Sequence, residues 1–136
     1  MVGVVLISHG DLGKGIISSA SMLVSDMLDQ LIEVSLWPGD NPDEFQKKLE
    51  NAIKEVDRGD GVFILADMLG GTPSNRAMYC LNDKVRMMTG LSLPMLYSLI
   101  NIREETSDLA ALARDVMAEA KEAMVDVNEL MASQKG

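Results

Sequence analysis

Basic residues are scarce in this chain of 136 residues, which has 12 Lys and Arg against 21 Asp and Glu and a formal net charge of −9 with its histidine neutral. Nucleic-acid binding requires many Lys and Arg side chains to neutralise phosphates, whereas acidic residues outnumber basic ones in this chain. An anionic membrane surface repels such a chain for the same reason. We therefore expect no nucleic-acid partner and no direct membrane binding.

Cysteine and histidine each occur once, as Cys80 and His9. A single cysteine cannot form an internal disulfide, which is typical of a reducing cytoplasm. One histidine and one cysteine leave a zinc site almost without ligands, so no metal is expected. The longest apolar runs are about seven residues, too short to span a bilayer, and no charged-then-apolar signal peptide opens the chain. These absences predict a cytoplasmic protein.

Aromatic residues make up only 4% of the chain, but hydrophobic residues reach 47% and include 11 methionines. That supply is enough for a core and excludes disorder, with methionine and aliphatic side chains in the places that aromatics often fill. The length fits one domain, and no repeat, linker or low-complexity stretch divides it. Residues 1–136 are therefore interpreted as a single domain.

Short apolar runs alternate with amphipathic stretches of helical length, separated by polar or Gly-rich turns. Continuous apolar runs are typical of strands that are buried on both faces. Their alternation with helices predicts an open α/β fold of flavodoxin-like size, with a mostly parallel sheet and helices on both faces. The predicted strands are 2–7, 31–36, 61–66 and 85–89, and the predicted helices are 12–28, 42–56, 73–81, 94–102 and 107–123.

Two segments in the last third of the chain have weaker patterns. Met124, Val125 and Val127 suit a short strand in the tail 124–130, but this tail could also extend the preceding helix. Residues 103–105 (Arg-Glu-Glu) are interpreted as a solvated loop between two helices.

The site of an open parallel sheet lies beyond the carboxyl ends of its strands, where the strand order reverses. If the second and third strands lie on opposite sides of the first, the loops that follow strands one and three face one crevice. The first of these loops is Ser8-His9-Gly10, and the second runs from Asp67 to Thr72. Gly10 lets a ligand or a partner backbone approach closely.

His9 and Asp67 are the candidate catalytic residues. Each alone has an ordinary interpretation, His9 as a solvated or capping histidine and Asp67 as a turn residue that closes its strand. Together they suggest a working pair, because a carboxylate that accepts from one imidazole nitrogen fixes the tautomer and leaves the other nitrogen as a nucleophile. The distance between the two side chains does not follow from the sequence.

The segment Gly70-Gly71-Thr72-Pro73 is the candidate phosphate-binding element. Thr72 suits an N-cap and Pro73 the first helical position, and the two glycines permit a tight turn whose N–H groups bind an anion. An ordinary Gly-rich strand-to-helix turn fits equally well. No Lys follows the glycines as in a Walker loop, and G-x-G-x-x-G is absent, so no nucleotide cofactor is expected. Transient phosphorylation of His9 is the chemistry that uses the imidazole, the carboxylate and the turn together.

Four motifs along the chain form one recognisable set. They are Ser8-His9-Gly10, Pro38-Gly39-Asp40-Asn41, Gly90-Leu91-Ser92-Leu93-Pro94-Met95-Leu96 and, most specific, Asp67-x-x-Gly70-Gly71-Thr72-Pro73-x-Asn75. This set resembles the IIA proteins of the mannose-type sugar phosphotransferase system (PTS). Ser92 departs from the Asn that the family usually carries, which affects loop contacts but not the phosphorylation residues. The resemblance implies one EIIA type-4 (mannose-family) domain over residues 1–136, without a cofactor.

The resemblance implies that HPr phosphorylates His9 on Nε2 and that His9 passes the group to a IIB protein or domain for sugar uptake. Asp67 would hold Nδ1–H, and the backbone of Gly71 and Thr72 with the Thr72 hydroxyl would hold the phosphoryl oxygens, in a site that includes Gly10 and Gly70. Membrane contact would be indirect, through IIC and IID partners. The family forms homodimers that exchange a C-terminal antiparallel strand, which would give the tail a role.

Two other functions suit a fold of this size. A two-component receiver domain is phosphorylated on an Asp at the end of strand three, as Asp67 is placed, but it needs an acidic pair after strand one. This sequence has Ser8-His9-Gly10 there, with only Asp11 nearby. A flavin-binding flavodoxin-like module is the other alternative, and the low aromatic content argues against ring stacking.

Overall fold

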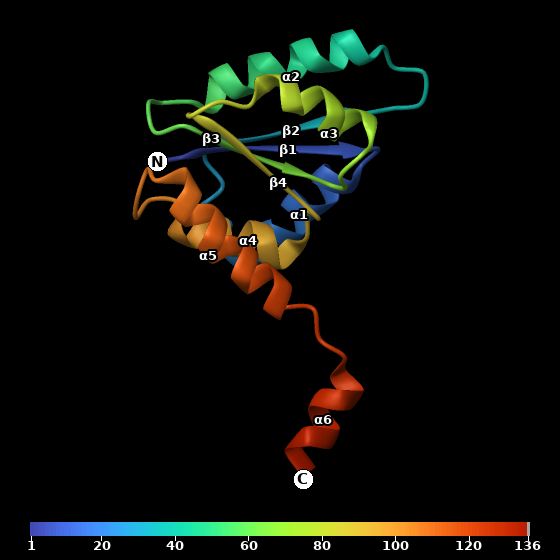
Figure 1. Ribbon diagram of the computed structural model, residues 1–136, viewed down its shortest axis with the longest axis vertical. Helices are drawn as coiled ribbons and strands as arrows, with labels where there is room; N and C mark the ends of the chain where they lie inside the picture. The colour runs from blue at the N-terminus through green and yellow to red at the C-terminus, as the bar shows by residue number, and fades with distance from the viewer. Residues whose placement is uncertain (136) are drawn as a thin grey trace.

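In the computed structural model, which describes residues 1–135, strands and helices alternate along the chain as the sequence predicts (Figure 1). Two predicted helices end early. The first ends at Val24, where the poor helix formers Ser25 and Asp26 follow, and the α-helix predicted over 73–81 ends at Ala77 and continues as a 3₁₀ turn. None of the helices in the described part is both long enough and apolar enough to cross a membrane. The elements are β1 (Gly3–His9), α1 (Leu12–Val24), β2 (Leu31–Leu36), α2 (Pro42–Val56), β3 (Val62–Ala66), α3 (Thr72–Ala77), the 3₁₀ turn η1 (Met78–Cys80), β4 (Val85–Thr89), α4 (Leu93–Ile102), α5 (Leu109–Glu122) and α6 (Val127–Lys135).

The strands form one parallel sheet in the order β2-β1-β3-β4. Within it, Ile7 of β1 lies beside Val34 of β2 and Ala66 of β3. Because β2 lies on one side of β1 and β3 on the other, the strand order reverses between β1 and β3. The carboxyl ends of these two strands therefore meet where the sequence places the site, and the predicted open α/β fold is confirmed.

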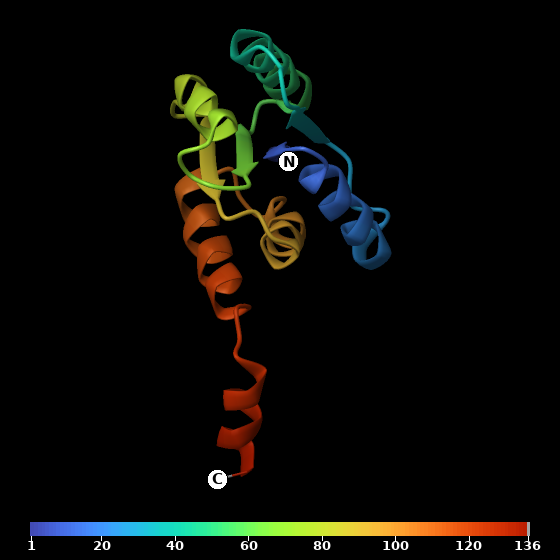
Figure 2. The same ribbon diagram turned by 90° about the vertical axis from the view of Figure 1, so that its right-hand side faces the viewer.

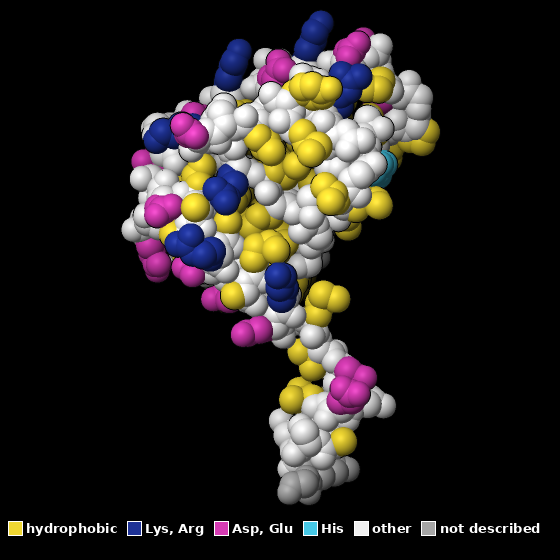
Figure 3. All heavy atoms as spheres, viewed as in Figure 1, with side chains coloured by type: hydrophobic (Ala, Val, Ile, Leu, Met, Phe, Trp, Pro, Cys, Tyr) yellow, Lys and Arg dark blue, Asp and Glu magenta, His cyan; other side chains and the backbone are white. Residues whose placement is uncertain are grey.

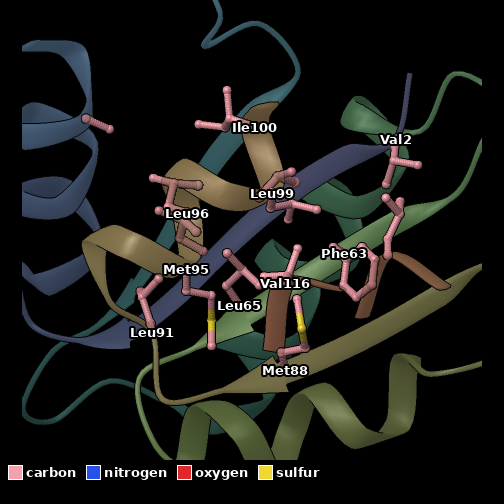
Figure 4. Packing of buried hydrophobic residues seen from close by; sticks show 14 of the residues in the cluster. Val2, Phe63, Leu65, Met88, Leu91, Met95, Leu96, Leu99, Ile100 and Val116 are labelled. Atoms are coloured by element: carbon pink, nitrogen blue, oxygen red, sulfur yellow. The ribbon is translucent and has the colours of Figure 1, made fainter. Parts of the chain in front are cut away.

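Helices cover both faces of the sheet, which explains why successive positions of β1 and β3 are apolar. On one face, Leu6 and Phe63 pack with buried residues of α1, α4 and α5, such as Leu99 and Val116 (Figure 4). On the other face, Ile7 packs in a second cluster with residues of α2 and α3. Figures 1 and 2 show these two groups of helices on opposite sides of the sheet. Each such buried side chain contributes about 1.5–3 kcal/mol, so burial on both faces holds the strands in place.

Short polar side chains cap the starts of α2 and α4. At α2, the Asn41 side chain accepts a hydrogen bond from the Asp43 N–H at 2.7 Å. At α4, the Ser92 hydroxyl accepts from the Met95 N–H at 3.2 Å. Ser and Asn are comparable N-caps, so the departure from the family pattern at Ser92 keeps the cap that this helix needs.

The tail beyond α5 is helical. Residues 124–126 have no regular structure, and the Asp126 side chain then caps α6 by accepting from the Glu129 N–H at 3.2 Å. The helix extends away from the body of the molecule (Figures 1 and 2), so the tail lies beside neither edge of its own sheet. A helix satisfies its own backbone groups, whereas an unpaired strand does not. In the single chain the tail is therefore a helix and not a strand, and the antiparallel strand exchanged in a dimer stays a prediction.

Arg103 is buried at the amino end of the sheet, with 1% of its side chain exposed. One guanidinium nitrogen donates to the carbonyls of Val2 at 3.4 Å and Gln30 at 3.3 Å, and the other donates to the carbonyls of Met27 at 3.0 Å and Asp29. The side chain thus ties the end of α4 to the start of β1 and to the connection between α1 and β2.

The prediction of a solvated loop at residues 103–105 is therefore wrong for Arg103, although it holds for the exposed Glu104 and Glu105. Burial lowers the pKa of the Arg103 guanidinium, and the negative charges of Asp29 and Glu104 oppose that shift. No apolar pattern in the sequence distinguishes this arginine, because its partners are carbonyls more than 70 residues away along the chain.

We expect Arg103→Met to lower the free energy of unfolding by about 3 kcal/mol, because four carbonyls in a buried or partly buried setting each lose one hydrogen bond. Lys47, exposed on α2, is the control, and Lys47→Met should change stability by less than about 0.5 kcal/mol. Urea unfolding followed by circular dichroism measures both variants. Equal stabilities of the two variants would contradict the role of Arg103.

Candidate functional site

His9 and Asp67 lie side by side at the carboxyl ends of β1 and β3. The Asp67 N–H donates to the Ile7 carbonyl at 3.1 Å, which continues the pairing of the two strands by one step. The Asp67 carboxylate then takes two hydrogen bonds from His9 on the same oxygen, Oδ2. The His9 backbone N–H lies 2.9 Å from it and the imidazole Nδ1 lies 2.7 Å from it. The prediction that these residues form a pair is thus met in the geometry.

The Asp67 carboxylate is well placed to stay ionised. Burial raises its pKa, but hydrogen bonds from the His9 N–H, the His9 imidazole and the Met68 N–H outweigh burial and leave the pKa below its usual value. An ionised carboxylate can only accept, so Nδ1 must carry the proton in the 2.7 Å contact. When the imidazole is neutral, its Nε2 is therefore unprotonated and carries a free lone pair.

The backbone of Gly71 lies against the Nε2 side of the imidazole ring. A Cβ atom at this position would stand 3.2 Å from His9 Nε2 and only 2.6 Å from His9 Cε1, and the second distance is shorter than real Cβ contacts. Only glycine therefore lets the turn pack this tightly on the ring. This contact joins the second predicted loop to the histidine of the first.

The other predicted phosphate-binding residues lie in the same two loops but without a close contact to the ring. Gly10, with φ of +60°, donates its N–H to the Leu36 carbonyl at 2.9 Å, and Gly70, with φ of +91°, has open space where a Cβ would stand. Thr72 is the first residue of α3 and Gly71 occupies the N-cap position, with no side-chain cap. The expectation that Thr72 is the N-cap is therefore wrong, and its hydroxyl is not used for capping.

Two buried serines support these loops, and the sequence analysis assigned neither of them a role. The Ser8 hydroxyl accepts from the Gly13 N–H at 3.1 Å, and the Ser74 hydroxyl accepts from the Gly70 N–H at 3.1 Å. Both side chains are fully buried. The sequence does place Ser8 next to His9 and Ser74 at the end of the Gly-Gly-Thr-Pro-Ser segment, which could have suggested a role. Serines are mostly exposed, however, so neither position predicts a buried hydroxyl.

The imidazole is half exposed, with 48% of its side chain accessible, and lies at the edge of the molecule in Figure 3. Apolar side chains of the neighbouring loops and of the start of α1 are also exposed, by 45% to 66%. Within the described residues, no group of three or more His, Cys, Asp or Glu side chains is placed to hold a metal ion. The site thus has a solvent-accessible imidazole and a rim of exposed apolar side chains. This apolar rim consists of Leu12, Trp37, Met68 and Leu69.

Comparisons with known proteins identify the family of the chain. The family model described as PTS system fructose IIA component (EIIA-man) matches residues 3–117. The fructose-specific EIIA component of Bacillus subtilis (strain 168) is 30% identical over 106 residues, which are 76% of this chain and 72% of that protein. The mannose-specific EIIAB component of Escherichia coli (strain K12) is 26% identical over 128 residues, which are 90% of this chain but only 39% of that protein.

A solved structure supports the same assignment. The mannose/sorbose-specific IIA subunit of the phosphotransferase system from Enterococcus faecalis superposes with a TM-score of 0.80 and 27% sequence identity, over 91% of this chain and 92% of that one. The family model covers most of the chain, and the fold agrees with a solved IIA subunit. The chain therefore belongs to the EIIA-man family of IIA components of the sugar phosphotransferase system.

Proposed function

We propose that His9 carries a phosphoryl group on Nε2, accepting it from phosphorylated HPr and passing it to a IIB protein or domain. The observation that carries this proposal is the 2.7 Å contact between Nδ1 and Asp67, which leaves Nε2 as the free nitrogen at an open surface. The family's IIA relatives belong to the same transport system, which supports the choice of donor and acceptor.

The transfer step needs no group beyond the two imidazoles and their surroundings. The Nε2 lone pair attacks the phosphorus of the donor phosphohistidine, the donor N–P bond breaks, and its electron pair returns to the donor ring. Nδ1 of His9 keeps its proton, so the phosphorylated ring becomes more cationic and the Asp67 carboxylate stabilises it. Phosphoryl transfer depends mainly on such positioning and charge stabilisation.

The Gly71 turn is proposed to hold the phosphoryl oxygens. In the hydrogen bonding of residues 1–135, the N–H groups of Gly71 and Thr72 have no acceptor, and the Thr72 hydroxyl is free of capping. Gly71 is also the residue in contact with the Nε2 side of the ring. Two free N–H donors beside the nucleophile suit a group that gains negative oxygens there. Gly10 and Gly70 complete the site by giving the two loops their shape.

The apolar rim around His9 is proposed as the surface that meets HPr and IIB in turn. Exposed apolar side chains that gather beside a reactive group mark protein–protein contact surfaces. An imidazole at an open surface also suits transfer between proteins better than enclosure of a flavin. The membrane would be reached only through IIC and IID partners, and we propose a cytoplasmic location.

Phosphorylation of Asp67 itself, as in a receiver domain, is less well supported. Its Oδ2 accepts two hydrogen bonds from His9, and its Oδ1 accepts one from the Met68 N–H at 2.8 Å. These hydrogen bonds hold the carboxylate against His9, as expected of a residue that orients the imidazole. A phosphohistidine survives base and is lost in acid, whereas an acyl phosphate is lost in base, so the lability of the label distinguishes the two.

We also propose that the protein forms a homodimer through its tail. The open edge of the sheet at β4 and the neighbouring α5 form a hollow with apolar and basic side chains, which Figure 3 shows on the facing side. Arg86, Arg114 and Lys121 line this hollow, and the tail carries Asp126 and Glu129. A second copy's tail therefore matches it in charge, and pairing with β4 would close an exposed edge. The tail adds exposed apolar side chains for this contact, namely Met124, Val125, Val127, Leu130 and Met131.

His9→Ala should abolish phosphoryl acceptance and leave the fold intact, because the side chain is exposed at the end of β1. The measurement is incubation with phosphoenolpyruvate, enzyme I and HPr, followed by mass spectrometry. The wild-type protein should gain one acid-labile phosphoryl group on His9. Labelling of the variant at the wild-type rate would refute the proposed function.

Asp67→Asn should slow phosphorylation by about tenfold to a thousandfold, or roughly 1.4–4 kcal/mol of barrier. The amide keeps the size of the side chain but removes the charge and permits the wrong tautomer of His9. Asp115→Asn, on the exposed side of α5, is the matched control and should leave the rate within about twofold. Stopped-flow transfer from phosphorylated HPr measures both, and a rate for Asp67→Asn near that of the control would mean that something else orients His9.

Truncation after Ala123 should convert the dimer into monomers and lower the melting temperature by about 5 °C, because the β4 edge loses its cover. Reversal of the tail charges in the full chain, by Asp126→Lys with Glu129→Lys, should weaken the dimer in the same direction. Sedimentation equilibrium and thermal melts compare these forms. A truncated chain with wild-type mass and melting behaviour would exclude tail exchange.

A further inference from the structure

We infer that Ser74 is a positioning residue for phosphoryl transfer at His9, because its hydroxyl fixes the turn on which the imidazole rests. This inference depends on the proposed function, since it assigns a residue to the same reaction. Ser74 lies on α3 and does not touch His9 in any hydrogen bond of the described residues, so it acts through the turn.

The Ser74 hydroxyl uses both its acceptor and its donor on the glycine turn. It accepts from the Gly70 N–H at 3.1 Å and donates to the Gly71 carbonyl at 3.1 Å. The side chain is fully buried, so water does not compete for these bonds. The Gly71 carbonyl also accepts from the Asn75 N–H at 2.9 Å. One hydroxyl therefore holds the peptide groups on both sides of the Gly70–Gly71 pair.

No other side chain is hydrogen-bonded to this turn within residues 1–135. Two consecutive glycines have more backbone freedom than any other pair of residues. Gly70 has φ of +91°, and no atom lies within 4 Å of the place where its Cβ would stand. The hydroxyl of Ser74 is thus the main side-chain restraint on the turn.

Movement of the turn reaches the imidazole directly. A Cβ at Gly71 would stand 2.6 Å from His9 Cε1, which shows how closely the Gly71 backbone follows the ring on the side of Nε2. The free N–H groups of Gly71 and Thr72 belong to the same turn. Donors stabilise a transition state when they are already in place, and misplacement by about 1 Å can cost about a hundredfold in rate. The loss should fall on the transfer step and not on docking, because Ser74 is buried away from the partner surface.

Ser98 offers a matched control within the same chain. It is also a buried serine on a helix, with 4% of its side chain exposed. Its hydroxyl has no hydrogen-bond partner among the described residues. Ser98→Ala therefore removes the same oxygen atom from a buried helix position without releasing a turn.

The test is single-turnover transfer from phosphorylated HPr over a range of HPr concentrations, with Ser74→Ala and Ser98→Ala in the full chain. We expect Ser74→Ala to lower the maximal rate by about tenfold to a hundredfold. The half-saturating HPr concentration should stay within twofold, and Ser98→Ala should match wild type. An unchanged maximal rate for Ser74→Ala, a change confined to half-saturation, or an equal loss in Ser98→Ala would each overturn the inference.

A second measurement separates this inference from the proposed function. Nuclear magnetic resonance of unphosphorylated protein follows the ring signals of His9, the sole histidine, and the exchange of the Gly70 amide. Ser74→Ala should shift the ring signals and speed Gly70 exchange, while Ser98→Ala should do neither. If wild type accepts no phosphoryl group, the proposed function fails, and unshifted ring signals in Ser74→Ala would still overturn the positioning role.

Discussion

The parallel pairing of β1 with β3 is the constraint on which the site depends. Ile7 lies beside Ala66 in this ladder, so the residues that follow, His9 and Asp67, emerge at one edge within hydrogen-bond distance. A shift of the register by one residue would turn the apolar side chains of a strand to the opposite face. Since both faces of these strands are buried, core packing and site geometry require the same register.

The amino end of the sheet contains buried polar side chains that stabilise the fold, whereas the carboxyl end contains the candidate site. At the amino end, Arg103 and Gln30 satisfy carbonyls of distant segments with buried side chains. At the carboxyl end, the polar groups are left partly open, and His9 is half exposed. Buried networks stabilise only when every partner is present, whereas a transfer site must leave one nitrogen unoccupied. Separation of the two along the strands lets each end meet its own requirement.

Much of the fold could be predicted because the apolar runs of β1 and β3 report burial directly in the sequence. The pairing of His9 with Asp67 could be predicted as well, since the ends of parallel strands meet at one edge. Their 2.7 Å contact could not, because it depends on the strand register and on rotamers. Ser74 and Arg103 were beyond reach for another reason. Both side chains bond to backbone N–H or carbonyl groups. Every residue type carries a carbonyl and nearly every type an N–H, so the sequence contains no pattern that identifies such partners.

The tail has a sequence that suits both a strand and a helix. Its alternating apolar residues suit a strand, yet Asp126 caps a helix there. Both patterns are present in the same residues, and the choice between them depends on whether a strand edge is available. In one copy the tail lies away from β4, so local capping decides the structure. The same segment beside the β4 edge of a second copy would gain a full ladder of backbone bonds.

The unequal exposure of His9 and Asp67 suits the proposed role of His9 as a phosphoryl carrier. The imidazole has 48% of its side chain accessible, whereas the carboxylate has 10%. A nucleophile that serves a donor and then an acceptor must be reachable from outside, so it cannot be enclosed. Partial burial of the carboxylate strengthens its hydrogen bond to the imidazole, because water competes less for its oxygens. Hydrogen bonds from the His9 and Met68 N–H groups offset the cost of that burial, which is why the pKa of Asp67 still lies below its usual value. A fixed, ionised partner behind an open ring is thus compatible with transfer in either direction.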